Sequence, residues 1–278
     1  MRIVITGAWG QLGRSLQEAL KGHKLFLIDL PEYDVADAGI IAAIAGFEPD
    51  LVIHAAAMTD VDGCELDPDA AYKVNALGTK NVALACQRCD APLLYISTDY
   101  VFDGTKDEPY LEFDEPNPIN IYGRSKLAGE DFVCCLLSHF YIVRSAWLYG
   151  QGGNNFVSKL LQLADERREL FMVTSEVGSP TYAPDLAQAV ACLIEHPLYG
   201  IYHLVNEGSC SRYEFAHRIL ELAGKSDFPL YPVETYERPA KVPQYAVLRN
   251  FCAATQLGIT LRPWEEALRA FFEERDDA

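Results

Sequence analysis

Short apolar runs alternate with longer segments of helical periodicity through the first half of the chain. The apolar runs are rich in β-branched residues and span 2–6, 24–30, 50–54, 92–97 and 140–144. Unbroken apolar runs of this length are typical of strands buried on both faces of a sheet. Helical segments follow them, among them 67–89 and 121–137. The alternation predicts an α/β fold, a doubly wound parallel sheet of the Rossmann type.

A glycine-rich turn joins the first strand to the first helix. Gly7, Gly10 and Gly13 follow the strand, and Gln11 and Leu12 lie between the last two glycines. Glycines in such a turn let the backbone approach a pyrophosphate at the positive end of a helix. The turn therefore predicts a dinucleotide site, although its spacing is G-x-x-G-x-x-G instead of G-x-G-x-x-G.

The second and third strands end in residues suited to the rest of a dinucleotide. Asp29 can accept hydrogen bonds from a ribose 2′-hydroxyl and would repel a 2′-phosphate. No arginine or lysine occurs in the ten residues after it. We therefore expect NADH to be preferred, with NADPH possible. Further cofactor contacts are expected from the loop beside the adenine and from the small residues after the third strand, namely Asp34, Val35, Ala55, Ala56 and Ala57.

A proton-handling group is predicted where the fourth strand ends and the next helix begins. Tyr122 and Lys126 are four residues apart, so they share one face of a helix. An ammonium about 4 Å from a phenol, at an effective dielectric constant of about 20, favours the phenolate by roughly 4 kcal/mol. We therefore expect Lys126 to lower the Tyr122 pKa, and Thr98 to donate its hydroxyl to a substrate oxygen. A surface pair is the alternative interpretation of the Tyr-x-x-x-Lys spacing alone.

Composition and charge exclude several classes of function. The chain has 278 residues, of which half are hydrophobic, and a formal charge of −17. This charge argues against a nucleic-acid partner, which needs a basic face. No run approaches the roughly 20 apolar residues of a membrane span. We expect a cytoplasmic protein without a membrane partner, whose Cys86 and Cys89 are buried free thiols.

These features together resemble the extended short-chain dehydrogenase/reductase superfamily and, within it, the dTDP-4-dehydrorhamnose reductase family. The likeness rests on the glycine turn, the Tyr-x-x-x-Lys pair, and the segments STDYVFDG and YGRSKLAGE. It continues through VDGCELDP and RSAWLYG to the late segment RPWE.

The resemblance implies a reductase that acts on the C4 keto group of a dTDP-4-dehydro-6-deoxy-L-sugar, most simply dTDP-4-dehydrorhamnose. It implies that Tyr122 is the general acid, that Lys126 holds the nicotinamide ribose, and that Thr98 binds the substrate carbonyl. Trp147 would form an aromatic wall against the sugar, and Arg238 would meet the diphosphate. The substrate contacts expected from the resemblance are Thr98, Asp99, Trp147, Asn155, Phe156 and Arg238.

The resemblance also implies two structural units. Residues 1–150 and about 182–206 would form the dinucleotide-binding domain, and about 151–181 and 207–278 a smaller C-terminal substrate-binding lobe. Ser15 stands where some members have an acidic residue at a Mg²⁺-bridged dimer contact. We therefore expect no metal, and a monomer or weak homodimer. Ser175-Glu176 replaces a common Asp-Gln pair, which bears on substrate detail.

Two other functions stay open from the sequence. An epimerase or 4,6-dehydratase of the same superfamily is one, but such a dehydratase needs an Asp-Glu pair after the threonine, where this chain has Asp99-Tyr100. The other is a non-catalytic subunit similar to the regulatory subunit of methionine adenosyltransferase. Retention of Thr98, Tyr122 and Lys126 disfavours the second alternative.

Overall fold

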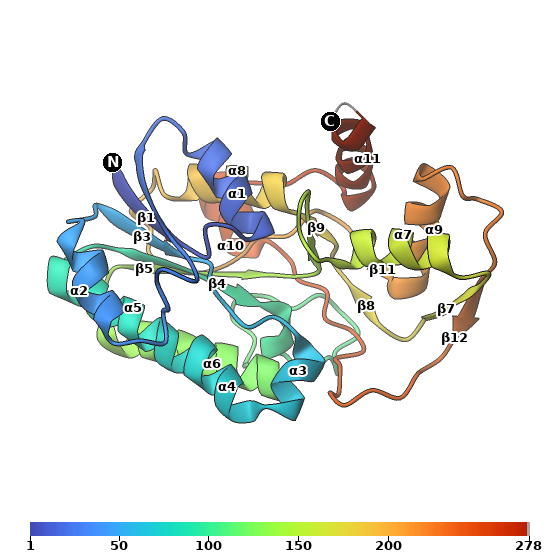
Figure 1. Cartoon of the computed structure of the whole chain (residues 1–278), viewed down its shortest axis with the longest axis horizontal. Helices are drawn as coiled ribbons and strands as arrows, with labels where there is room; N and C mark the ends of the chain where they lie inside the picture. Colours follow the sequence, from blue (N-terminus) through green and yellow to red (C-terminus); the bar gives the residue numbers. More distant parts are fainter. Residues whose placement is uncertain (277–278) are drawn as a thin grey trace.

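A six-stranded parallel sheet organises the protein, whose structure is a computed structural model that describes residues 1–276 (Figure 1). The strand order is β10-β5-β4-β3-β1-β2, and every neighbouring pair is parallel. The strands are β1 (Arg2–Thr6), β2 (Lys24–Ile28), β3 (Leu51–His54), β4 (Leu93–Thr98), β5 (Phe140–Ser145) and β10 (Gly200–His203). The predicted doubly wound sheet is confirmed.

A layer of helices covers each face of the sheet (Figure 1). On one face, α1 (Gln11–Ala19), α8 (Ala183–Leu193) and α10 (Phe251–Leu257) share a core with β1 and β3. On the other face, α2 (Gly39–Gly46), α5 (Thr79–Cys89) and α6 (Ile121–Leu136) share a second core with the same strands. Because both faces are covered, the central strands need apolar residues at successive positions. This explains why they stand out in the sequence as continuous apolar runs.

The strand order reverses between β1 and β3, since β2 follows β1 on one side and β3 pairs on the other. In open α/β sheets, ligands bind outside the carboxyl ends of the strands at such a reversal. The fold therefore predicts a ligand site at the loops that follow β1, β3 and β4.

The helical segment predicted at 67–89 is interrupted in the structure. It consists of α4 (Pro68–Tyr72), a π-helical turn η1 (Lys73–Gly78) and α5, and a short helix α3 (Val61–Leu66) precedes it. The π turn carries buried Asn75, whose amide bonds to Met58 N (2.8 Å), Met58 O (3.0 Å) and Ser125 Oγ (3.0 Å). Asn75 thus ties the loop after β3 to α6, with protein partners for its amide oxygen and its amide nitrogen.

A smaller group of elements lies beyond one end of the sheet (Figure 1). Its core is formed by α7 (Phe156–Glu166), α9 (Arg212–Leu222) and α11 (Trp264–Asp276), with Leu160, Phe215 and Leu268 buried among them. Short strand pairs lie in or beside this group: β6 (Leu148–Tyr149) with β9 (Thr181–Tyr182), β8 (Val177–Gly178) with β11 (Cys210–Ser211), and β7 (Leu170–Val173) with β12 (Leu230–Val233).

One segment departs from the expected division into two units. Cys252 and Ala253 of α10, with Ile259 and Leu261 after it, pack in the sheet core, although 207–278 was assigned to the smaller lobe. Residues 277 and 278 of that range lie outside the described residues. The division otherwise stays a prediction, with the segment around α10 moved to the sheet.

Candidate active site

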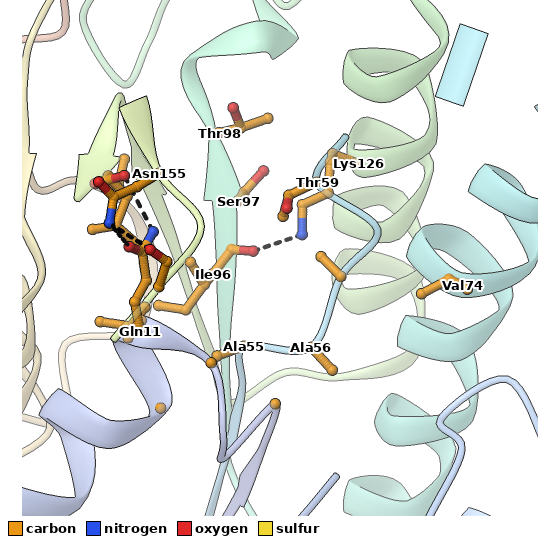
Figure 2. Close-up of a pocket in the computed structure, with 18 of the residues that line it drawn as sticks. Gln11, Ala55, Ala56, Thr59, Val74, Ile96, Ser97, Thr98, Lys126 and Asn155 are labelled. Atoms are coloured by element: carbon orange, nitrogen blue, oxygen red, sulfur yellow. Dashed lines mark hydrogen bonds between the residues drawn. The ribbon is translucent and has the colours of Figure 1, made fainter. Parts of the chain in front are cut away.

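A cavity of about 760 Å³ lies at the carboxyl edge of the sheet, around the ends of β1, β3 and β4 (Figure 2). Most residues predicted for cofactor, substrate or catalysis line it. They are Gly7, Gly10, Gln11, Leu12, Gly13, Asp29, Asp34, Val35, Ala55, Ala56, Ala57, Thr98, Asp99, Tyr122, Lys126, Trp147 and Asn155. Phe156 and Arg238 are not among its lining residues.

The glycine turn leaves no room for side chains at two positions. Gly7 has φ +69°, and a Cβ on it would lie 2.7 Å from Ala56 N. A Cβ on Gly13 would lie 2.2 Å from Gly7 O. α1 begins directly after Gly10, and no side chain caps its first amides. Uncapped amides in a turn that lines a cavity fit a pyrophosphate, so these residues are compatible with a bound dinucleotide.

Asp29 joins the end of β2 to the glycine turn. Its Oδ2 accepts a hydrogen bond from Trp9 N (2.8 Å), and its Oδ1 accepts one from Leu30 N (2.8 Å). The carboxylate therefore holds the turn in place while it lines the cavity. Gln11 and Asn155 also act as connectors, since Asn155 caps α7 and donates from Nδ2 to Gln11 Oε1 (3.1 Å).

Thr98, Tyr122 and Lys126 meet at the same cavity because two elements converge on it. Thr98 ends β4, while Tyr122 and Lys126 lie one turn apart on α6. The start of α6 is fixed by Asn120, whose Oδ1 accepts a hydrogen bond from Gly123 N (2.8 Å). The three residues are thus brought together, and their catalytic roles stay predictions.

The electrostatics of the tyrosine and lysine differ from expectation. Lys126 Nζ donates to Ile96 O (2.7 Å; Figure 2), and burial lowers the Lys126 pKa to about 7 although Glu130 opposes this. Burial raises the Tyr122 pKa, and a hydrogen bond with Thr98 only partly offsets the rise. The predicted lowering of the Tyr122 pKa by Lys126 is therefore wrong for this structure. Desolvation of the phenol is the largest effect on the Tyr122 pKa, and Lys126 is not among the groups that shift it.

Asp99 is a buried acid beside the predicted catalytic threonine. Its Oδ1 accepts a hydrogen bond from Thr98 Oγ1 (2.9 Å), whereas its Oδ2 is buried without a hydrogen-bond partner among residues 1–276. Burial raises the Asp99 pKa to about 7, although the Thr98 hydrogen bond and the charge of Arg212 lower it. A carboxyl group in this state can either donate or accept a hydrogen bond near neutral pH.

Trp147 lies in the cavity wall in an unusual backbone conformation. Its φ is +42°, and a Cβ on neighbouring Gly178 would lie 2.5 Å from its ring. A bulky residue in the left-handed region is strained and persists only where its surroundings fix it. Here Gly178 makes the space, and the guanidinium of Arg212 stacks on the indole, with Cζ 3.5 Å from the ring centroid.

Arg212 is a charged cavity residue that the sequence analysis did not predict. It is the first residue of α9, directly after the N-cap Ser211, and it lines the cavity. A cation opposes the positive end of the helix dipole, and this misfit was the available sequence signal. Phe156, predicted as a substrate contact, packs in the core of the smaller unit, stacked on Phe215 at 5.5 Å between centroids. The ring is only partly buried and also lies 4.9 Å from the Arg212 Cζ, so its role as a substrate contact stays a prediction.

Arg238 lines a second cavity of about 1400 Å³. Its Nε and Nη2 lie 3.1 Å from the two carboxylate oxygens of Asp62. Glu176 lies between the two arginines, since its Oε1 is 4.0 Å from Arg238 Nη1 and its Oε2 is 3.6 Å from Arg212 Nε. Glu176 also lines the second cavity, so the wall between the two cavities is charged.

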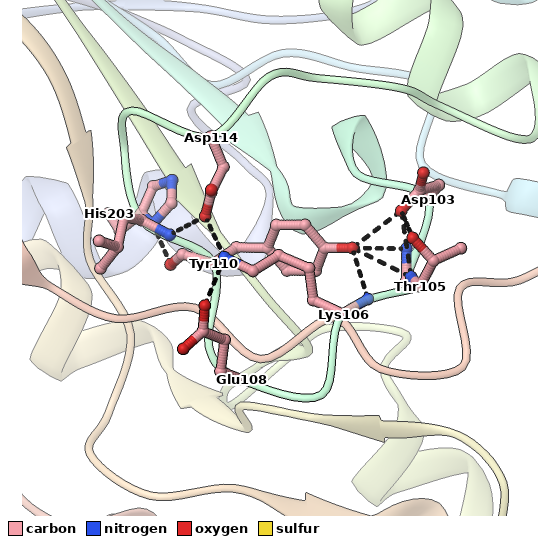
Figure 3. Close-up of polar contacts among 9 residues, drawn as sticks. Asp103, Thr105, Lys106, Glu108, Tyr110, Asp114 and His203 are labelled. Atoms are coloured by element: carbon pink, nitrogen blue, oxygen red, sulfur yellow. Dashed lines mark hydrogen bonds and ion pairs between the residues drawn. The ribbon is translucent and has the colours of Figure 1, made fainter.

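The loop before α6 forms another wall of the second cavity, and Figure 3 shows polar contacts that hold this loop. The Tyr110 hydroxyl donates to Asp103 Oδ1 (2.9 Å) and accepts from the amides of Gly104 and Thr105 (3.1 Å each). Lys106 Nζ lies 2.8 Å from Asp114 Oδ2. These contacts fix an acidic, proline-rich segment between β4 and α6.

His54, the last residue of β3, is a buried structural histidine. Its Nδ1 lies 2.6 Å from Thr6 Oγ1, and its Nε2 lies 3.0 Å from Thr79 Oγ1.

Within residues 1–276, no group of three or more His, Cys, Asp or Glu residues is placed to hold a metal. In the same part of the chain, no helix combines the length and apolar character needed to cross a bilayer.

Comparison with known proteins places this architecture in one family. Residues 1–276 match the family described as RmlD substrate binding domain. The spore coat polysaccharide biosynthesis protein SpsK of Bacillus subtilis is 41% identical over 100% of this chain and 99% of its own. The dTDP-4-dehydrorhamnose reductase of Mycolicibacterium smegmatis is 41% identical over 96% of this chain and 84% of its own. The crystal structure of dTDP-4-dehydrorhamnose reductase from Bacillus anthracis in complex with NADP is 42% identical, with a TM-score of 0.95 over 98% of this chain and 99% of that one. The chain therefore belongs to the dTDP-4-dehydrorhamnose reductase family.

Proposed function

We propose that this protein reduces the C4 keto group of a dTDP-4-dehydro-6-deoxy-L-sugar, converting dTDP-4-dehydrorhamnose to dTDP-L-rhamnose. The observation that carries the proposal is the position of Thr98, Tyr122 and Lys126 in one cavity with the glycine turn. A dinucleotide seated on that turn reaches the three polar side chains across the ends of β1, β3 and β4. Family membership supports the same substrate class.

The cofactor, when bound, supplies the hydride. The protein holds the ketone oxygen between the hydroxyls of Thr98 and Tyr122 and delivers a proton to it. Because burial raises the Tyr122 pKa, the phenol is protonated at neutral pH and can act as the acid in the direction of reduction. Lys126, one helical turn away, binds the nicotinamide ribose with the ammonium that also donates to Ile96 O.

The remaining cofactor contacts follow the cavity from the glycine turn to the end of β2. The amides around Gly10 bind the pyrophosphate, and Asp29 binds the adenosine ribose. Asp34 and Val35 flank the adenine, and the alanines at 55–57 allow close approach of the nicotinamide half. The smaller unit binds the nucleotide-sugar, with the diphosphate near Arg238 in the second cavity. In this proposal the protein works as a monomer or weak homodimer.

The test is a reductase assay with a matched variant. Purified protein, NADH and dTDP-4-dehydrorhamnose are mixed, and loss of the reduced nicotinamide absorbance is followed. Tyr122→Phe removes one hydroxyl and should lower kcat by about 100- to 10,000-fold, with the NADH dissociation constant nearly unchanged. If the unaltered protein consumes no NADH with this or related keto-sugars, the proposal fails. If the variant loses cofactor binding as well, Tyr122 has a structural role instead.

Preference for NADH over NADPH is a second prediction, carried by the Asp29 carboxylate. Asp29→Asn removes the charge and keeps an amide oxygen for the Trp9 amide. We expect the kcat/KM ratio of NADH to NADPH to fall by about 10-fold, since one repulsive charge at short range in water is of this order. Asp37→Asn, on a residue outside the cavity, is the control. An unchanged ratio in Asp29→Asn would contradict this role.

A further inference from the structure

A buried ion pair lies one helical turn beyond Lys126 on α6. Arg144 of β5 donates to the two carboxylate oxygens of Glu130, from Nε at 3.0 Å and from Nη2 at 2.7 Å. Only 2% of the Arg144 side chain and 4% of the Glu130 side chain are exposed. Neither residue is among those that line the active-site cavity, so neither is placed to touch a ligand there.

Stability is a weak explanation for the Glu130–Arg144 pair. Taking two charges out of water is unfavourable, and well-packed apolar residues of similar volume are often as stable as the buried pair that they replace. The Nη1 group of Arg144 is moreover buried without a hydrogen-bond partner among residues 1–276. We therefore looked for the role of the pair in its remaining contact.

That contact is made by Ser97, which connects the pair to the strand that carries Thr98. The Ser97 hydroxyl donates to Glu130 Oε1, and Ser97 lies beside Arg144 in the register of β4 and β5. Ser97 directly precedes Thr98, the last residue of β4. Three elements of the fold, β4, β5 and α6, thus meet at one buried carboxylate. We call Ser97, Glu130 and Arg144 the brace.

A second bond joins β4 to α6 one residue earlier on the strand (Figure 2). Lys126 Nζ donates to Ile96 O at 2.7 Å. Lys126 and Glu130 are four residues apart on α6, so the two bonds leave the same face of the helix. The strand is therefore joined to the helix at two successive residues, immediately before Thr98.

We propose that the brace holds Thr98 at the spacing from Tyr122 and Lys126 that proton delivery to the ketone requires. This inference rests on the proposed function. Thr98 and Tyr122 come from different elements, so their spacing is only as well fixed as the contacts between β4 and α6. A displacement of about 1 Å between groups that hold a substrate can lower the rate by about 100-fold. Glu130 and Arg144 act through other residues and are positioning residues.

The brace also acts on the charge of Lys126. Burial lowers the Lys126 pKa to about 7, and the Glu130 carboxylate opposes this change. Arg144 and Ser97 hold the carboxylate in the position from which it does so. The other titratable groups that contact Lys126, act on it or line the cavity beside it are His54 on β3, Tyr95 on β4, Asp99 after β4 and Tyr122 on α6.

The first test removes the link to β4 and leaves the ion pair intact. Ser97→Ala should lower kcat by about 10-fold or more, as expected for loss of a hydrogen bond to a charged group that orients the site. The NADH dissociation constant should stay nearly unchanged. Ser179→Ala is the control, because it removes another buried serine hydroxyl, one that has no partner among residues 1–276 and lies outside both cavities.

Two results with Ser97→Ala would overturn the proposal. One is a kcat equal to that of Ser179→Ala and of the unaltered protein. The other is a loss of NADH binding in proportion to the loss of kcat. Because Ser97 lines the cavity, that result would make it a cofactor contact instead.

The second test replaces the ion pair without leaving one buried charge behind. Glu130→Leu combined with Arg144→Met should keep the urea midpoint of unfolding close to that of the unaltered protein. The same double variant should lower kcat by about 10-fold or more. Full kcat in the folded double variant would overturn the proposal, and Ser97→Ala decides the question if the double variant does not fold.

A titration without substrate separates failure of this proposal from failure of the proposed function. The Lys126 side chain is followed by NMR of protein with isotope-labelled lysine, and Lys126→Arg identifies its signal. The ammonium should lose its proton near pH 7 in the unaltered protein and at lower pH in Glu130→Gln, which lacks the carboxylate charge. Turnover with full kcat in Ser97→Ala would overturn the brace and leave the reductase standing. If there is no turnover, the reductase proposal fails, and an unchanged Lys126 titration in Glu130→Gln would then overturn the brace as well.

Discussion

Lys126 is a cation whose burial works against its own charge. Its ammonium donates to Ile96 O and lies 4.2 Å from the Tyr95 ring centroid, with little contact to water. One turn further along α6, Glu130 is bound by Arg144 at 3.0 Å from Nε and 2.7 Å from Nη2, so its charge is shared. The attraction of Glu130 therefore only partly offsets the lowering of the Lys126 pKa by burial, and that pKa stays near 7.

This pKa predicts how reduction depends on pH. Lys126 is protonated below about pH 7 and neutral above it, so a step that needs its ammonium should slow as the pH rises through 7. We expect kcat/KM for reduction to fall above an apparent pKa near 7. Asp99 also has a pKa of about 7, so the profile is measured in Asp99→Asn as well. If kcat/KM still falls above pH 7 in Asp99→Asn, the fall is assigned to Lys126. If kcat/KM no longer falls in that variant, the fall is assigned to Asp99.

At the residue scale, the spacing of residues in the sequence predicts which side chains lie close together better than it predicts their pKa values. The i, i+4 relation placed Tyr122 and Lys126 in one cavity, because a helix fixes that relation locally. The direction of the Tyr122 pKa shift was wrong because burial depends on elements far away in the sequence. Arg212 was missed for the same reason, since its contact with Trp147 spans 65 residues of sequence.

Among the secondary-structure elements, the strands buried on both faces of the sheet were predicted with the most accurate bounds. β1 begins and ends as its apolar run does. The helix α3 and the π turn were missed because their boundaries depend on tertiary contacts, such as those of Asn75 with Met58 and Ser125. Two-residue strands such as β6 and β8 have no periodicity to detect.

Asn120, at the start of α6, should contribute to the stability of the protein and to the position of a loop that lines the second cavity. Asn120 accepts from Gly123 N (2.8 Å) and donates from Nδ2 to Lys241 O (2.7 Å), which links α6 to the loop at Lys241. Asn120→Ala should lower the free energy of unfolding by about 1–3 kcal/mol, through loss of the cap and of the second bond. Asn120→Asp keeps the acceptor and should lose less. Equal losses in urea unfolding of the two variants would show that the cap contributes nothing.

At the scale of the whole molecule, the buried histidines His54 and His203 lie at the ends of sheet strands, and neither is among the predicted catalytic residues. His54 ends β3 between two threonines, and His203 ends β10 with Nδ1 3.2 Å from Tyr110 O (Figure 3). Burial lowers the pKa of both rings to about 3, with nearby Lys126 acting on His54 and Arg144 on His203 in the same direction. Both rings are therefore neutral in the folded protein over the whole range in which a free histidine titrates.

These histidines predict a loss of stability in mild acid. Above pH 6.5 the ring is neutral in both states, but between 6.5 and about 3 the unfolded chain binds a proton that the folded protein does not. Each such ring therefore lowers the free energy of unfolding by up to about 1.4 kcal/mol per pH unit as the pH falls. His203→Gln should make urea unfolding less dependent on pH between 6.5 and 4 than in the unaltered protein. His217→Gln, at an exposed position of α9, should leave the dependence unchanged, and equal slopes in all three proteins would show that the His203 ring is protonated in the folded state.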